Sequence, residues 1–254
     1  MRRIFIVFLF ISFIGNAQTN SYNISFENAV HHEARISITF PEIKTTSVIV
    51  RMSRTSPGRY ALHEFAKNVY GFKATNSKGE PIKVKRPDPY SWKVSDHDGT
   101  INIEYILFAN RGDGTYSQID ETHAHLNIPA TFMYAENLEH RPVSVNFDVR
   151  KDLDWKVATQ LKQESGTTYS APDLYYFMDS PTEISDFDMK EFELNGQQIR
   201  FALHHQGTEE EFAQYFDQVK RIVEQEKAVY GELPDFDYDK YTFLACYMPN
   251  VSGD

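Results

Sequence analysis

The stretch TEEEFAQYFDQVKRIVEQEKAVYGELP, residues 208–234, followed by YTFLACYM, residues 241–248, decides the fold predicted for this chain. Apolar residues recur at helical spacing from Phe212 to Tyr230, which predicts one long helix with a single apolar stripe. The second segment is apolar almost throughout, so it is predicted to be a strand buried on both faces.

Both ends of the predicted helix carry boundary signals. Thr208 and Glu211 form a T-x-x-E capping box at its start, and Gly231 follows its last turn. A helix and a strand this apolar need partners to cover them, yet few residues follow the strand before Asp254. The sequence is therefore interpreted as cut near the beginning of a second domain.

The first part of the chain has the pattern of an antiparallel β-sandwich. Ala34 to Phe40 alternates apolar and polar residues with period two, as a half-buried strand does. Similar short segments recur between turn residues, which is typical of a sandwich. Further strands are predicted at 47–52, 70–74, 82–84, 100–107, 131–134 and 143–149.

The sequence becomes more polar after Trp155. Residues 162–170 are polar and contain glycine, so they are interpreted as a loop or a boundary. Strands are predicted at 174–178, 191–194 and 199–203, ahead of the long helix. The expected organisation is a mainly β chain with a signal peptide at 1–17, an N-terminal antiparallel β-sandwich at 18–158, and the α+β beginning of a second domain at 159–254.

Composition and charge narrow the class of protein. Of the 254 residues 41% are hydrophobic, which is enough for a packed core, and the net charge is -10. That charge argues against non-specific binding to nucleic acid or to an anionic membrane surface. The only cysteine, Cys246, lies in the apolar strand, so no intramolecular disulfide forms and nothing nearby in sequence favours it as a nucleophile.

The N-terminus has the pattern of a secretory signal peptide. Residues 1–3 are MRR, residues 4–14 are an apolar run, and Gly15-Asn16-Ala17 supplies a cleavage site before Gln18. The alternative is a membrane anchor, which the short apolar run makes less favourable. We expect a secreted or periplasmic protein with no membrane attachment after cleavage.

Histidines provide the candidate metal ligands. His123 and His125 would point the same way on a strand, with Glu121 close by, and such a pair can share a metal ion. No third ligand is identifiable, and a solvated loop is the alternative. The pairs at 31–32 and 204–205 would point to opposite faces of a strand. Because the sequence contains no H-E-x-x-H, no metal ligand or catalytic residue is assigned.

Acidic residues cluster twice in the second part of the chain. Asp179, Glu183, Asp186 and Asp188 resemble either a carboxylate site or a surface turn, and their Ser and Pro neighbours favour the turn. The alternating acidic and aromatic residues of 235–239 are interpreted as a solvated connector.

Several segments together resemble the N-terminal part of the glycyl-aminopeptidase family, whose members are thermolysin-like zinc metallopeptidases and usually carry a PDZ domain. The resemblance spans nearly all of the chain after the signal peptide and rests on the order of SPGRY (56–60), EFAKNV (64–69), NIPATF (127–132), VNFD (145–148), WKVA (155–158), YSAPDL (169–174), DSPTE (179–183), GELP (231–234) and YTFL (241–244).

The resemblance implies a function for a longer parent protein. The parent would use zinc to remove N-terminal residues, of the Gly or Ala type, from peptide substrates. The family's G-x-E-H and H-E-x-x-H segments do not occur in this sequence, so the chain alone is expected to hold no zinc and to be inactive. By analogy with related enzymes, Asn127 is the one residue expected to face the substrate cleft.

A different class of function remains open at this point. The chain can also be interpreted as a free-standing secreted β-sandwich that binds peptide or glycan through exposed aromatic residues in loops. Tyr90, Trp92 and Tyr116 are the candidates for such a surface. The terminal helix and strand argue against this interpretation, because a binding module has no need of them.

Overall fold

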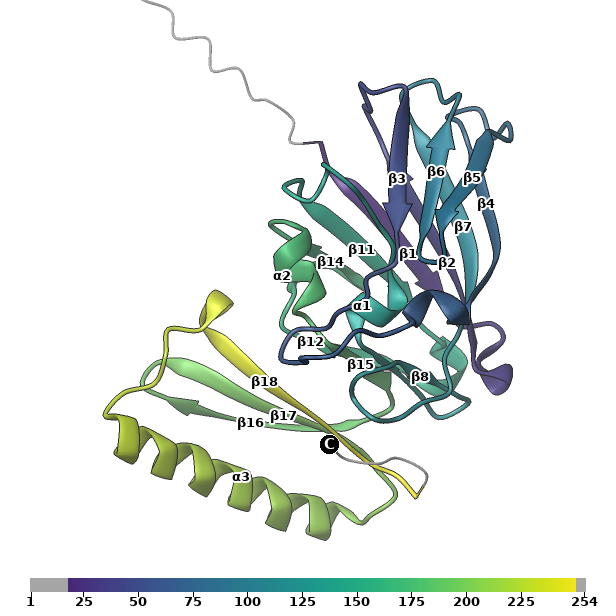
Figure 1. Cartoon of the computed structure of the whole chain (residues 1–254). Coiled ribbons are helices and arrows are strands. Elements are labelled where there is room, and N and C mark those ends of the chain that lie inside the picture. The colour runs from purple at the N-terminus through teal and green to yellow at the C-terminus, as the bar shows by residue number, and fades with distance from the viewer. Residues whose placement is uncertain (1–17, 250–254) are drawn as a thin grey trace, which may run out of the picture.

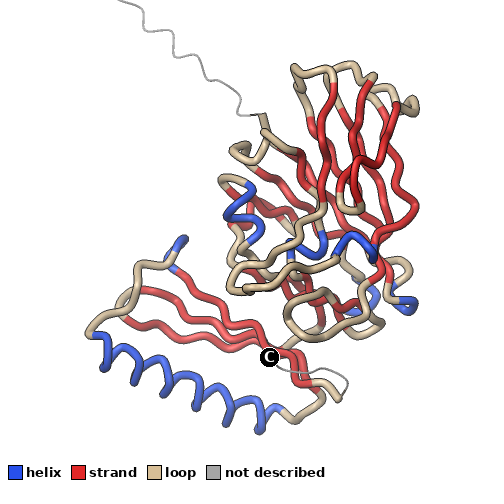
Figure 2. Tube along the Cα trace, in the orientation of Figure 1, coloured by secondary structure: helices blue, strands red, loops and turns tan. Residues whose placement is uncertain are grey.

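The computed structural model describes residues 18–249, which form a β-rich body and a smaller unit of one sheet and one helix (Figure 1). Strands dominate the body, whereas the smaller unit combines strands with one long helix (Figure 2). The predicted signal peptide and its cleavage site, at 1–17, lie outside the described residues. Within 18–249, no helix combines the length and the apolar character that crossing a bilayer requires.

A seven-stranded sheet forms the base of the body. Its strand order is β13-β14-β11-β1-β2-β7-β4, and every neighbouring pair is antiparallel except β1 with β11. The strands are β1 (Asn20–Ser25), β2 (Glu33–Phe40), β4 (Val69–Thr75), β7 (Ile101–Phe108), β11 (Val143–Asp148), β13 (Lys162–Ser165) and β14 (Thr168–Ala171). Residues 162–170, which the sequence suggested as a loop or boundary, thus lie in the hairpin of β13 and β14.

Two four-stranded antiparallel sheets complete the body. One has the order β10-β3-β6-β5 and the other β12-β15-β9-β8. The first contains β3 (Ser47–Arg51), β5 (Lys83–Asp88), β6 (Ser91–Ser95) and β10 (Tyr134–Ala135). The second contains β8 (Gln118–Ile119), β9 (His123–Leu126), β12 (Lys156–Thr159) and β15 (Thr182–Ser185). Short helices connect them: α1 (Ile128–Thr131), α2 (Leu174–Met178), η1 (Ala29–His31), η2 (Phe65–Asn68) and η3 (Lys151–Leu153).

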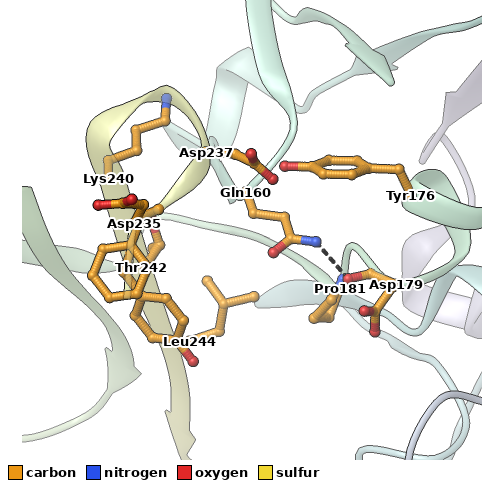
Figure 3. A pocket seen from close by; sticks show the side chains of 11 residues that line it. Gln160, Tyr176, Asp179, Pro181, Asp235, Asp237, Lys240, Thr242 and Leu244 are labelled. Carbon is orange, nitrogen blue, oxygen red and sulfur yellow. Dashed lines mark hydrogen bonds between the residues drawn. The ribbon is translucent and has the colours of Figure 1, made fainter. Parts of the chain in front are cut away.

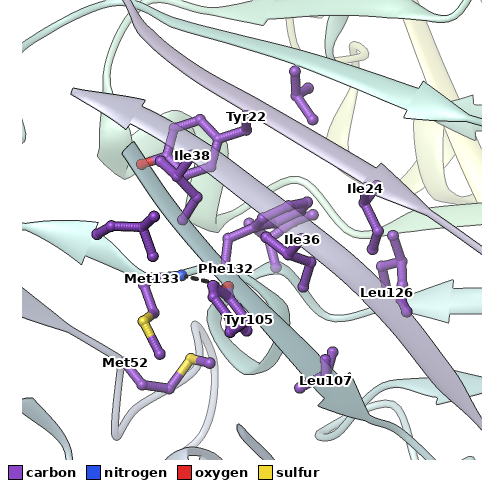
Figure 4. Close-up of a cluster of buried hydrophobic side chains, with 14 of the residues drawn as sticks. Tyr22, Ile24, Ile36, Ile38, Met52, Tyr105, Leu107, Leu126, Phe132 and Met133 are labelled. Atoms are coloured by element: carbon purple, nitrogen blue, oxygen red, sulfur yellow. Dashed lines mark hydrogen bonds between the residues drawn. The ribbon is translucent and has the colours of Figure 1, made fainter. Parts of the chain in front are cut away.

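One hydrophobic core joins the three sheets of the body (Figure 4). The alternation predicted for β2 is confirmed, because Ile36, Ile38 and Phe40 are buried while the residues between them are not. Tyr105 of β7 lies fully inside this core, and its hydroxyl donates a hydrogen bond of 2.7 Å to the carbonyl of Thr131. The antiparallel β-sandwich expected from the sequence is therefore present.

The smaller unit is a strand hairpin followed by a helix and a parallel strand. β16 (Asp188–Leu194) and β17 (Gln197–His205) are antiparallel, and the helix α3 (Glu209–Tyr230) leads through η4 (Asp237–Asp239) to β18 (Lys240–Tyr247), which pairs parallel to β17. Parallel neighbours need such a crossover. The predicted capping box of Thr208 and Glu211 is confirmed, and Gly231 ends α3 with φ 90°.

Three other predicted elements also differ from the structure. Residues 174–178 form α2 rather than a strand, because Asp173 caps the segment by accepting a hydrogen bond from the backbone N–H of Tyr176 at 2.8 Å. Residues 128–131 form α1, which shortens the strand predicted at 131–134 to β10. β18 is a strand as predicted, but its residues are half-buried or exposed rather than buried on both faces.

Candidate functional site

A buried polar cluster lies where the body meets the smaller unit, and Glu183 of β15 is at its centre. Strand pairing explains its composition. Glu183 lies opposite His125 of β9, and period-two alternation puts His123 on the same face. In the neighbouring sheet, His204 of β17 lies opposite Cys246 of β18. Two pairs of strands thus bring five chemically active side chains to one place.

The distances within the cluster are those of direct contact. Nδ1 of His123 lies 3.2 Å from Oε1 of Glu183, and Nδ1 of His125 lies 2.9 Å from Oε2. Sγ of Cys246 lies 3.5 Å from Nδ1 of His204 and 3.8 Å from Nδ1 of His123. The rings of His123 and His204 stack with their centroids 4.7 Å apart.

Burial makes these contacts electrostatically strong. Glu183 is 1% exposed and His123 is 1% exposed, so water screens neither group. Burial opposes ionisation of Glu183, but the hydrogen bonds from His123 and His125 outweigh it and hold the pKa of this carboxyl well below its usual range. The side chain of Glu183 is therefore a buried carboxylate.

The pKa values of the two stacked imidazoles, His123 and His204, are shifted in opposite directions. Burial disfavours the charged form of His123, but its hydrogen bonds with Cys246 and Glu183 prevail and raise its pKa to about 10. Burial, together with the charge on His123, lowers the pKa of His204. The cluster thus pairs one carboxylate with one protonated imidazole and leaves a neutral imidazole beside the thiol.

The structure revises what the sequence predicted for these residues. His123 and His125 do point the same way, but the acid between them is Glu183, whereas Glu121 is exposed. His204 and His205 point to opposite faces of β17, as predicted. His204 belongs to the cluster, whereas His205 forms a hydrogen bond of 3.2 Å with Asp188.

One residue was interpreted wrongly. Glu183 does not belong to a surface turn, because β15 carries it into the interior. For Cys246, the structure adds two imidazoles that contact its thiol. Neither set of partners was visible in the sequence, because these residues lie far apart along the chain.

A cleft of about 420 Å³ opens between the body and β18, at the other end of that strand (Figure 3). Its lining includes Gln160, Tyr176, Asp179, Asp237 and Lys240. Burial, and then the neighbouring Asp237 carboxylate, raises the pKa of Tyr176, so its phenol stays protonated. Three carboxylates line this cleft, those of the two named Asp residues and of Asp235. They outnumber the single ammonium group, so the cleft favours cationic groups.

Asn127, predicted to face the substrate, lies at the start of α1 with 6% of its surface exposed. Its amide group donates to Oγ of Ser56 at 3.1 Å and also to the carbonyl of Thr115. The side chain therefore ties together two loops that are distant in the sequence. It lies neither in the cluster nor in the cleft's lining.

The aromatic residues suggested for a peptide or glycan surface are not exposed. Trp92 is 3% exposed and stacks on Phe72, and Tyr116 is 6% exposed against Phe65. Tyr90 is half-buried beneath the guanidinium of Arg54. The feature that supported a free-standing binding module is therefore contradicted.

A known family model matches most of this chain. The model of the peptidase M61 N-terminal domain matches residues 21–186, which comprise the whole body apart from its first strand residue. The match ends just before β16, where the smaller unit begins. No curated protein matches the chain at a significant level.

Solved structures share the fold at low sequence identity. The chain is similar to an aminopeptidase N family protein from Idiomarina loihiensis, with a TM-score of 0.83 and 20% identity over 91% of this chain. It is more weakly similar to an M1 zinc metallopeptidase from Deinococcus radiodurans, with a TM-score of 0.43 and 10% identity over 93% of this chain. The chain spans 40% and 57% of the lengths of these two proteins.

Proposed function

Because the chain belongs to the M61 peptidase family, we propose that it is the N-terminal portion of a secreted zinc aminopeptidase that removes N-terminal glycine or alanine from small peptides. The family match supports the peptidase part of this proposal. The substrate and the secretion rest on the sequence resemblance and on the pattern of residues 1–17.

One observation carries the proposal: β18 is an apolar strand at the edge of its sheet, and its side chains are only partly covered. Its eight residues are all half-buried or exposed, although the sequence from Tyr241 to Tyr247 is almost entirely apolar. Apolar surface of this kind is stabilised when another element removes it from water, by about 25 cal/mol for each Å². We propose that the remainder of the peptidase domain covers it.

The catalytic zinc of such an enzyme is not assigned to this chain. The sequence contains no H-E-x-x-H, and His123 and His204 beside Glu183 are at most 3% exposed. A catalytic zinc needs an open position for water. What this chain contributes is instead one wall of the substrate site: the cleft beside β18 and the loops that Asn127 holds.

The proposal predicts that a longer protein containing this chain has aminopeptidase activity and that the 254-residue chain alone has none. We expect the product of the full reading frame to hydrolyse the arylamides of glycine and alanine, and the 254-residue chain to hydrolyse neither. Release of the arylamine measures the rate, and a metal chelator should abolish it in the longer protein. Turnover by the 254-residue chain, or none by the longer protein, would contradict the proposal.

The same assay tests the role proposed for Asn127. If Asn127 positions loops beside the substrate, the Asn127→Ala variant of the longer protein should show a higher KM with a smaller change in kcat. Asn28, an exposed asparagine outside the lining of the cleft, provides the control substitution. Unchanged KM with a folded variant would remove Asn127 from the substrate site.

Secretion makes a separate prediction about the N-terminus. Because Gly15-Asn16-Ala17 forms a cleavage site, the protein exported from cells should begin at Gln18. Intact mass and N-terminal peptide analysis of the exported protein measure this directly. Recovery of an exported protein that begins at Met1 would contradict the signal-peptide assignment.

A further inference from the structure

Three metal-binding side chains meet in the buried cluster, each from a different strand. His123 comes from β9, His204 from β17 and Cys246 from β18, and we refer to these three residues as the His–His–Cys cluster. One ligand atom of each lies within 4.8 Å of the others. Imidazole nitrogen and thiolate sulfur are the ligands that zinc prefers in structural sites.

The spacing of the donor atoms suits one tetrahedral ion. A zinc ion with Zn–N near 2.0 Å and Zn–S near 2.3 Å places its sulfur and nitrogen ligands about 3.5 Å apart. Sγ of Cys246 lies 3.5 Å from Nδ1 of His204 and 3.8 Å from Nδ1 of His123. The first distance already has this value and the second is 0.3 Å longer, and the two stacked rings would rotate to direct both nitrogen lone pairs at one ion.

Glu183 supplies a fourth donor at similar spacing. Its Oε1 lies 3.2 Å from Nδ1 of His123 and 3.9 Å from Nδ1 of His204. Its other oxygen accepts a hydrogen bond from His125 at 2.9 Å, which fixes the orientation of the carboxylate. An outer partner of this kind is typical of metal sites.

Charge balance favours a divalent cation here. Binding of a divalent ion would release the proton of the Cys246 thiol and one proton of His123, and the resulting thiolate and the carboxylate of Glu183 would together balance the charge of the ion. Burying charges without such compensation is costly. His123, Glu183 and His204 are each at most 3% exposed, whereas Cys246 is half-buried.

We propose that His123, His204 and Cys246 bind one Zn²⁺ ion, with Glu183 as the fourth ligand, at the junction between the body and the smaller unit. The ion joins β9 and β15 of the body to β17 and β18. It fixes the orientation of the smaller unit against the body, where the two β-sheets otherwise meet through few buried apolar residues, chiefly Ala158, Phe187 and Ala202. The inference does not depend on the proposed peptidase activity.

The test is zinc binding by the purified 254-residue chain. The protein is stripped with a chelator, given Zn²⁺ and desalted, and the zinc content is measured by mass spectrometry. We expect one zinc ion per chain, and competition with a chromophoric chelator gives the affinity. Cys246→Ser and His204→Gln should each weaken binding by about 100-fold or more, whereas the exposed control His140→Gln should not change it.

Cobalt substitution provides a measurement that needs no variant. A thiolate bound to Co²⁺ gives an intense near-ultraviolet charge-transfer band, and Cys246 is the only cysteine of the chain. We expect this band together with the visible absorption of tetrahedral Co²⁺. Three results would each overturn the proposal. These are a chain that holds no zinc after Zn²⁺ has been added and the protein desalted, a cobalt complex without the thiolate band, and an unchanged zinc affinity in Cys246→Ser.

Discussion

Replacement of Glu183 by alanine is expected to lower the free energy of unfolding by about 3–5 kcal/mol. Glu183 is 1% exposed and accepts hydrogen bonds from His123 and His125 at 3.2 and 2.9 Å. Its removal takes the carboxylate away from the buried imidazolium of His123, and breaking a buried ion pair in this way is strongly destabilising. Urea denaturation of the metal-free protein, followed by circular dichroism, measures the change.

Asp186 provides a matched control for this substitution. It lies three residues further along the chain, but its side chain is 68% exposed and its oxygen is 4.0 Å from His204. Exposed ion pairs contribute about 0–1 kcal/mol, so Asp186→Ala should have a small effect. A loss below about 1 kcal/mol in Glu183→Ala would mean that the cluster contributes little to stability.

Much of the architecture could be predicted because it depends on local patterns. The alternation of apolar and polar residues in 34–40 correctly predicted a half-buried strand. The capping residues Thr208 and Glu211 correctly predicted the start of α3. Period two also placed His123 and His125 on one face of β9, and it separated His204 from His205. These predictions needed only neighbouring residues.

The cluster itself could not be predicted, because its contacts join distant parts of the chain. Glu183 is 60 residues from His123, and Cys246 is 123 residues from it. In the sequence, Glu183 stands among Asp, Ser and Pro residues that usually form surface turns. Only the pairing of β15 with β9 shows that its side chain points inward.

The sequence before helix α2 contains a helix cap, but the apolar run that follows led to the prediction of a strand. The run Leu174 to Met178 is short and apolar, and such runs do not distinguish a buried strand from a short helix. Asp173 immediately before it is a favourable helix cap, and its side chain accepts the expected hydrogen bond from Tyr176. In a short apolar segment, the capping residue before it therefore distinguishes a helix from a strand better than the apolar content does.

Phe132→Ala is expected to lower the free energy of unfolding by about 3–5 kcal/mol, as removal of a fully buried aromatic ring does. Phe132 follows α1 directly and is 0% exposed. Its ring lies 5.5 Å from that of Tyr22 and 5.3 Å from that of Phe177, measured between centroids. The ring therefore connects β1 with α2, which carries Tyr176 of the cleft.

The surrounding residues cannot close the space that this ring leaves. Tyr22 and Phe177 are held in β1 and α2, and both are nearly fully buried, so the substitution creates a cavity rather than a collapse. Phe108→Ala is the control, because Phe108 lies on β7 with 41% of its surface exposed and should cost less than about 1 kcal/mol. Urea midpoints of the two variants give the comparison. If the two variants lose the same free energy of unfolding, the burial of Phe132 and its contact with α2 do not contribute the stability proposed for them.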